Sequence, residues 1–129
     1  MATSARDAAA RRAALLVGAQ MEALVERVLV ADGWLILARN WRGGGGELDV
    51  IARRGGPLDA EVRFVEVKAR DQEDPLADEA VSASKRTRLR RAARLWMEQV
   101  DWNGPASFLV AMVDPADETV VWIDDAFDG

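Results

Sequence analysis

The fold of this chain is decided by two short stretches, Glu47-Leu-Asp-Val-Ile-Ala52 and Val62-Arg-Phe-Val-Glu-Val-Lys-Ala69. Both are rich in β-forming residues, and in both the apolar and charged side chains alternate, which is the pattern of a β-strand with two unlike faces. The glycine- and proline-containing segment 53–57 between them reads as a turn. We therefore expect two strands that lie close together in one sheet.

The alternation also predicts which side chains share a face. Leu48 and Val50 should lie on one face of the first strand, with Glu47, Asp49 and Ile51 on the other. In the second strand, Phe64, Glu66 and Lys68 should share a face. If the two strands pair as neighbours, three carboxylates would crowd together with an ammonium beside them.

Patterns outward from this pair complete the fold. Residues 1–12 read as a frayed lead-in or the start of a helix, and residues 8–31 have helical periodicity. Residues 34–38 form an apolar run suited to a buried strand. Residues 71–78 read as a polar loop before a helix over 78–99, whose apolar stripe comprises Val81, Leu89, Ala92, Ala93 and Trp96. Strands follow at 108–113 and 119–123. The order α-β-β-β-α-β-β predicts an α/β fold, a mixed sheet flanked by helices in one domain of residues 1–129.

Composition excludes several kinds of chemistry. The chain has no cysteine and no histidine, so disulfides, thiolate metal sites and His-dependent nucleophilic catalysis are ruled out. Any metal must be held by oxygen ligands, which suits Mg²⁺ or Mn²⁺ rather than Zn²⁺. No secretory leader or membrane-spanning run is evident, so we expect a cytoplasmic protein without membrane association.

The acidic cluster predicted on the two strands suggests a metal site. Burying an unpaired carboxylate costs on the order of several kcal/mol of free energy. Neighbouring carboxylates also repel each other until a proton or a cation compensates their charge. A divalent cation removes this conflict, polarises a phosphoryl oxygen and lowers the pKa of bound water. The alternative is an exposed edge strand with a surface ion pair between Glu66 and Lys68, which contributes roughly 0–1 kcal/mol.

At these residues the sequence resembles the YraN family, a group of small bacterial proteins with a restriction-endonuclease-like fold of the PD-(D/E)xK superfamily. The resemblance runs from about residue 18 to residue 113. The stretches that carry it are Gly33-Trp-Leu-Ile-Leu-Ala-Arg-Asn-Trp-Arg42, Gly46-Glu-Leu-Asp-Val-Ile-Ala52, Phe64-Val-Glu-Val-Lys-Ala-Arg70 and Glu79-Ala-Val81 with Lys85 and Arg88-Leu89. The chain departs from the family pattern at Met21, where Gly is usual, and at Leu109, where Asp is typical.

The resemblance implies roles for individual residues. Asp49 and Glu66 become metal ligands and Lys68 the catalytic lysine, and Glu22 completes the acidic cluster from the first helix. Glu47 matches the Glu of the family's Gly-Glu-x-Asp segment and is a further candidate metal ligand. The implied activity is that of a Mg²⁺- or Mn²⁺-dependent DNA endonuclease similar to Holliday-junction resolvases, with branched or processed DNA as candidate substrate. Two alternatives stay open: a non-catalytic nucleic-acid-binding module on the nuclease fold, and a protein-interaction scaffold.

Charge is distributed unevenly along the chain. The net charge is −5, yet six basic residues and no acid fall between Lys85 and Arg94. The expected partner is a nucleic acid, DNA, and its candidate contacts are Lys85 and Arg88 near the helix start and Arg42 before the glycines. The alternatives are a solvated helix face and an ion-pair partner for the acidic remainder of the chain. The run Gly43–Gly46 is expected to be a flexible hairpin tip beside the metal site, and a two-fold homodimer is a further expectation.

Overall fold

The computed structural model describes residues 5–70 and 83–124. The elements are α1 (Ala5–Ala31), β1 (Leu35–Gly43), β2 (Gly46–Arg54), β3 (Glu61–Ala69), α2 (Ala83–Gln99), β4 (Ala106–Asp114) and β5 (Thr119–Asp124). This order confirms the α-β-β-β-α-β-β prediction. The expected loop at 71–78, the expected helix start at residue 78 and Val81 lie outside the described residues.

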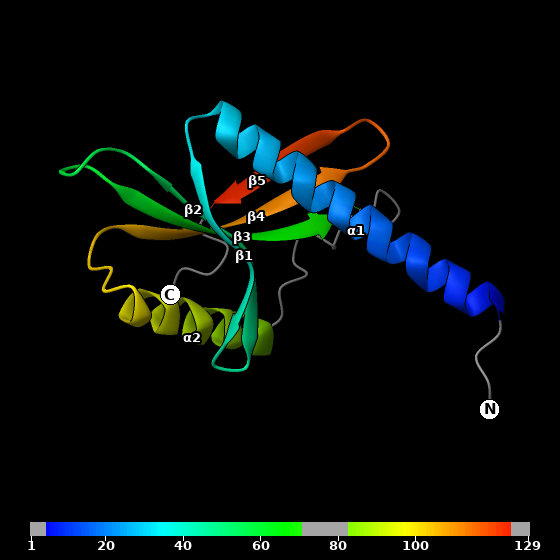
Figure 1. The fold of residues 1–129 in the computed structure, drawn as a ribbon, viewed down its shortest axis with the longest axis horizontal. Coiled ribbons are helices and arrows are strands. Elements are labelled where there is room, and N and C mark those ends of the chain that lie inside the picture. Colours follow the sequence, from blue (N-terminus) through cyan, green and yellow to red (C-terminus); the bar gives the residue numbers. More distant parts are fainter. Residues whose placement is uncertain (1–4, 71–82, 125–129) are drawn as a thin grey trace.

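The five strands form one mixed sheet in the order β1-β2-β3-β4-β5. Strands β3 and β4 are parallel and the other neighbours are antiparallel. A parallel pair needs a crossover connection, and α2 lies within the one that joins β3 to β4. Figure 1 shows α1 across one face of the sheet and α2 against the other. This architecture is the predicted one and is compatible with a restriction-endonuclease-like fold.

Each face of the sheet has its own hydrophobic core. On the α2 face, Phe64 meets Trp96 edge to face, with ring centroids 5.7 Å apart. The predicted apolar stripe of α2 is confirmed, because Leu89, Ala92, Ala93 and Trp96 are all buried. On the α1 face, Val25 and Leu29 pack against Val50 and Val65. The sheet is thus held between two helices that bury different sets of side chains.

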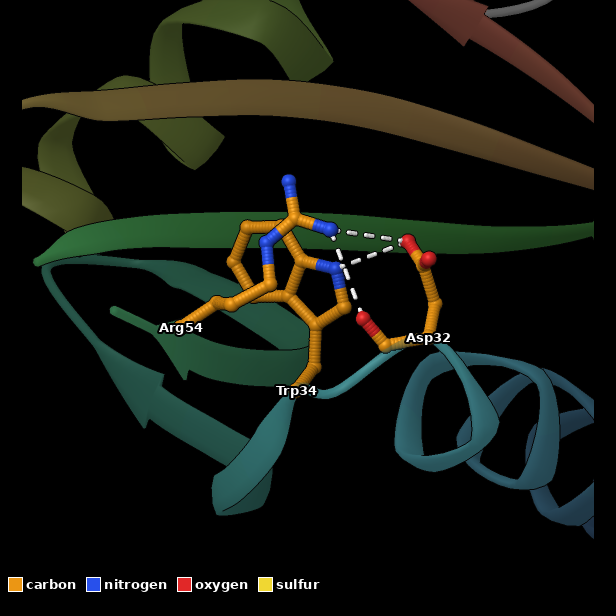
Figure 2. A network of polar contacts seen from close by, with 3 residues as sticks. All are labelled: Asp32, Trp34 and Arg54. Carbon is orange, nitrogen blue, oxygen red and sulfur yellow. Dashed lines mark hydrogen bonds and ion pairs between the residues drawn. The ribbon is translucent and has the colours of Figure 1, made fainter. Parts of the chain in front are cut away.

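The junction between α1 and the sheet is held by three residues. Asp32 follows α1, and its carboxylate accepts hydrogen bonds from the indole N–H of Trp34 at 3.3 Å and from Arg54 at 3.0 Å. Figure 2 shows the Arg54 guanidinium beside the Trp34 indole, with Cζ 4.6 Å from the ring centroid. This cluster connects α1, the start of β1 and the end of β2, and so fixes how α1 lies across the sheet.

The structure decides between the two readings of the first segment. Residues 5–12 belong to α1, consistent with the high helix propensity of an alanine-rich segment. The expected buried strand at 34–38 is longer and forms an edge of the sheet, with Leu35 and Leu37 exposed by 63% and 41%. An apolar run does not by itself show whether both faces of a strand are covered.

No helix in the described ranges has the length and apolarity needed to cross a bilayer.

The predicted shared face of Leu48 and Val50 is wrong. Leu48 packs in the core on the α2 side, whereas Val50 and Ala52 pack on the α1 side. The register of β1 and β2 places Asn40 opposite Asp49, and Asn40 has a positive φ of 49°. Asparagine is one of the few non-glycine residues that adopt this conformation readily. The alternation is therefore broken at the position of Asp49, close to the expected active site.

Candidate functional site

A cavity of about 710 Å³ opens where α1, the β1–β2 hairpin, β3 and α2 approach one another. Its lining has both carboxylates and basic groups: Glu22, Glu47, Asp49, Glu66, Arg42, Lys85 and Arg88. All but one of the candidate site residues therefore lie around this cavity. The exception is Lys68, which is not among the lining residues.

Asp49 is held at the point where β2 and β3 separate. The paired register of these strands runs from Arg54 opposite Glu61 to Val50 opposite Val65. Asp49 is the residue before Val50 in β2, and its carboxylate accepts a hydrogen bond from the backbone N–H of Val67 at 2.8 Å. The side chain thus satisfies a strand N–H, and its orientation is set by β3.

The carboxylates of Asp49 and Glu66 are close enough to interact strongly. Burial, repulsion from Glu66, a side-chain hydrogen bond with Glu66 and the charge of Glu22 raise the pKa of Asp49 from 3.8 to about 7. The hydrogen bond from Val67 acts in the opposite direction, because it stabilises the ionised form. Glu66 itself is only 8% exposed. Two neighbouring acids in a partly buried cavity are the arrangement that either a shared proton or a cation stabilises.

Lys85 reaches this acidic pair from the other side of the cavity. Its Nζ lies 2.6 Å from Oε1 of Glu66 in an ion pair, and its side chain is 40% exposed. The side chain of Lys85 therefore faces the cavity. Arg88, one helical turn further along α2, lines the same cavity and is exposed.

Glu22 and Glu47 lie further out in the cavity. The side-chain amide of Asn40 donates to Glu22 at 3.4 Å, and Glu47 is 3.7 Å from Arg42 in an exposed ion pair. Among residues 5–70 and 83–124, no three carboxylates are grouped tightly enough to surround a single ion. The expected crowding of Glu47, Asp49 and Glu66 is therefore reduced here to the contact between Asp49 and Glu66. Sequence alternation alone did not anticipate the irregular backbone opposite Asp49.

Lys68 lies two residues beyond Glu66 in β3, where regular alternation gives it the same face. It is partly exposed and sits opposite Met112 of β4 in the parallel register. The predicted shared face of Phe64, Glu66 and Lys68 therefore agrees with the strand's regular pairing. Its catalytic role stays a prediction.

The glycine run serves helix packing, which the sequence did not indicate. Gly44 and Gly45, with φ of 60° and 82°, form the two-residue turn of the β1–β2 hairpin. A Cβ on Gly46 would come within 2.4 Å of the backbone oxygen of Arg88. Only glycine permits this close approach, so the run seats α2 against the hairpin and brings its first turns to the cavity. The sequence showed four consecutive glycines, but not the helix that they contact.

The tryptophan and arginine ahead of the glycines are occupied within the fold. Trp41 packs against the core on the α2 side, and Arg39 pairs with Glu26 at 2.6 Å. The indole of Trp41 is therefore part of the packing between β1 and α2. Arg42, whose side chain is 80% exposed, is the residue of this segment that lines the cavity.

Comparison with known proteins agrees with the sequence resemblance. The profile of the "Uncharacterised protein family UPF0102" matches residues 21–114. A UPF0102 protein of Methylocella silvestris is 45% identical over 92 residues, covering 71% of this chain and 70% of that protein. One of Methylorubrum extorquens is 43% identical over 97 residues, covering 75% and 72%. One of Solibacter usitatus is 38% identical over 111 residues, covering 82% and 81%.

The matched range begins at Met21, beside Glu22, and ends at Asp114 with the last residue of β4. It therefore contains every charged residue that lines the cavity. The agreement of this profile with the identities to the three relatives shows that the chain belongs to the UPF0102 family, the group also known as YraN.

Proposed function

We propose that this protein is a Mg²⁺- or Mn²⁺-dependent endonuclease that hydrolyses phosphodiester bonds of DNA. The observation that carries the proposal is the contact between Asp49 and Glu66 in a cavity that Lys85, Arg88 and Arg42 also line. Carboxylates suit a hard divalent cation, and basic groups beside them suit the phosphate it would act on. The family description names no activity, so the proposal rests on this geometry.

The donor set fits magnesium or manganese. Mg²⁺ in phosphoryl-transfer sites is commonly held by one or two carboxylates together with water and substrate phosphate. Asp49 and Glu66 supply the two carboxylates. The raised pKa of Asp49 means that its ionised form is unfavourable at this position, and a bound cation would stabilise that form. Glu22 adds negative charge at longer range. When bound, the metal would polarise a phosphoryl oxygen and promote ionisation of water.

The remaining residues have roles in binding and orientation. The backbone N–H of Val67 donates to one carboxylate oxygen of Asp49 and so holds this side chain in one orientation. The second oxygen of Asp49 can then contact a cation. Arg88 and Arg42 are exposed at the cavity and are placed to contact non-bridging phosphate oxygens. Glu66 is almost fully buried, and electrostatic interactions are stronger at buried groups than in bulk water.

A cleavage assay tests this proposal. Linear and branched DNA would be incubated with the protein in Mg²⁺, in Mn²⁺ and in chelator, beside the variants Asp49→Ala, Glu66→Gln and Glu98→Gln. Glu98 is exposed on α2 and does not line the cavity, so it controls for loss of an acid. We expect metal-dependent cleavage that the first two variants lose and Glu98→Gln retains. Equal cleavage by all four proteins would show that a contaminant or another site is responsible.

One observation favours a second candidate, a DNA-binding module without catalysis. Glu66 is already paired with Lys85, and the described residues group only two carboxylates closely. Salt-dependent DNA binding that persists in Asp49→Ala, with no cleavage by the wild type in either metal, would support this alternative. A cytoplasmic location and a two-fold homodimer remain predictions under either function.

A further inference from the structure

We infer that Lys85 of α2, rather than Lys68 of β3, is the lysine that contacts the reacting phosphate. The inference rests on the proposed function and sharpens it, because the sequence pattern Glu66-x-Lys68 points to the strand lysine instead. What separates the two lysines is their position relative to the cavity that Asp49 and Glu66 share.

The ammonium group of Lys85 is already at the acidic pair. Its Nζ is 2.6 Å from Oε1 of Glu66, and the side chain lines the cavity together with Asp49. Glu66 is almost fully buried, whereas Lys85 retains 40% exposure of its side chain. The lysine therefore contacts the buried carboxylate and is still partly exposed in the cavity that both residues line.

Lys68 is placed differently. It follows Glu66 by two residues in β3 and lies opposite Met112 in the parallel register, but it does not line the cavity. Lys85 lines the cavity because α2 packs closely against the β1–β2 hairpin, where Gly46 approaches the backbone of Arg88. The function expected of a strand lysine is thus supplied here from the neighbouring helix.

The chemistry needs a positive charge at this position. In hydrolysis the oxygen of water bonds to phosphorus while one bridging P–O bond breaks. The attacking water gives up a proton and the leaving oxygen takes one, so the products are a phosphate monoester and a hydroxyl. Negative charge builds on the non-bridging oxygens in between, and an ammonium group there stabilises it. Lys85 would serve this purpose by turning from Glu66 toward the phosphate.

The same ion pair makes a second, separate expectation. A cation held by Glu66 must share that carboxylate with the ammonium of Lys85. Replacing Lys85 by an uncharged side chain removes this competition and the repulsion between the two positive charges. The affinity for Mn²⁺ measured without DNA should therefore rise, while cleavage falls. A residue with only a structural role would not produce opposite changes in these two quantities.

The test compares Lys85→Met with Lys68→Met, with Arg94→Met as the matched loss of a positive charge on the exposed side of α2. Cleavage of DNA in Mn²⁺ and calorimetric Mn²⁺ affinity are measured for each. We expect Lys85→Met to lose cleavage on the order of 100-fold and to bind Mn²⁺ several-fold more tightly. Lys68→Met and Arg94→Met should each lose less cleavage than Lys85→Met, and Arg94→Met should bind Mn²⁺ as tightly as the wild type.

Lys85→Arg guards against misfolding, since it preserves the ion pair with Glu66. It should recover part of the cleavage that Lys85→Met loses. Wild-type cleavage by Lys85→Met, a larger loss in Lys68→Met, or unchanged or weaker Mn²⁺ binding by Lys85→Met would each overturn the assignment while leaving a metal-dependent nuclease intact. A wild type that neither binds Mn²⁺ nor cleaves would overturn the proposed function, and the role of Lys85 with it.

Discussion

Asp49 holds a proton that an exposed aspartate would lose. Burial and the neighbouring Glu66 raise its pKa from 3.8 to about 7, so between these values the folded protein binds more protons than the unfolded chain. The free energy of unfolding therefore falls as pH rises through this window, by up to about 1.4 kcal/mol per pH unit. Below pH 4 both states are protonated and above pH 7 both are ionised, so this dependence is confined to the interval between them.

Asp49→Asn should remove this dependence. The amide oxygen can still accept the hydrogen bond from Val67, but the variant has no charge to repel Glu66. In metal-free buffer at pH 8 we expect Asp49→Asn to be more stable than the wild type by roughly 2 kcal/mol after allowance for partial exposure. At pH 4 the two should agree. Urea unfolding from pH 4 to 8 measures this, and parallel pH profiles for the two proteins would contradict it.

Sequence alone could predict part of this residue-scale chemistry. Charged side chains at alternate positions of apolar strands identified Asp49 and Glu66, because such positions are normally apolar. The ion pair of Lys85 with Glu66 depends on where α2 crosses the sheet, which no local pattern records. The positive φ of Asn40 opposite Asp49 was likewise hidden, and with it the broken alternation between Leu48 and Val50.

At the scale of elements, the β1–β2 hairpin and α2 form one packed unit. Gly46→Ala would place a Cβ 2.4 Å from the backbone oxygen of Arg88, so either the hairpin or the helix must move. We expect a loss of about 2–4 kcal/mol in the free energy of unfolding, measured by urea denaturation. Because Lys85 and Arg88 lie on the displaced helix segment, DNA binding should weaken as well.

Gly45→Ala is the matched control for this prediction. Its Cβ would meet nothing within 4 Å, although its φ of 82° disfavours alanine. The loss should therefore be smaller, about 1 kcal/mol, with little change in DNA binding. Equal losses for the two variants would mean that backbone conformation, and not contact with α2, explains the glycine run.

Element types and order were predictable because periodicity and turn residues are local signals, and the stripe of α2 confirmed this. Exposure was less predictable. The run at 34–38 is apolar enough for a central strand, yet Leu35 and Leu37 are exposed at the sheet edge. For residues 1–12 the sequence left a frayed lead-in and a helix start open, and the structure shows helix from Ala5.

At the scale of the whole molecule, an acidic protein carries a basic segment, uninterrupted by acids, on one helix. The chain has 17 basic and 22 acidic residues, and six of the basic residues fall between Lys85 and Arg94. Binding to a polyanion would therefore depend on that helix and fall steeply as salt rises. Net charge alone would have argued against a nucleic-acid partner, whereas the position of Arg88 at the cavity supports one.

Arg88→Ala and Arg94→Ala separate a directed contact from general attraction. Both arginines are exposed on α2, but only Arg88 lines the cavity. We expect Arg88→Ala to weaken DNA binding by about tenfold near physiological salt and to lower the salt slope by about one. Arg94→Ala should have a smaller effect. Fluorescence anisotropy at several salt concentrations measures both, and identical titrations for the two variants would indicate non-directional binding.

The most direct test of the central claim, that Asp49 and Glu66 together hold a divalent cation, is calorimetric titration of Mn²⁺ at pH 8. The proteins are the wild type, Asp49→Asn, Glu66→Gln and the surface control Glu98→Gln. The account predicts one Mn²⁺ site per chain in the wild type and in Glu98→Gln, weakened by at least about tenfold in the other two variants. Wild-type Mn²⁺ affinity in Asp49→Asn and Glu66→Gln would contradict it.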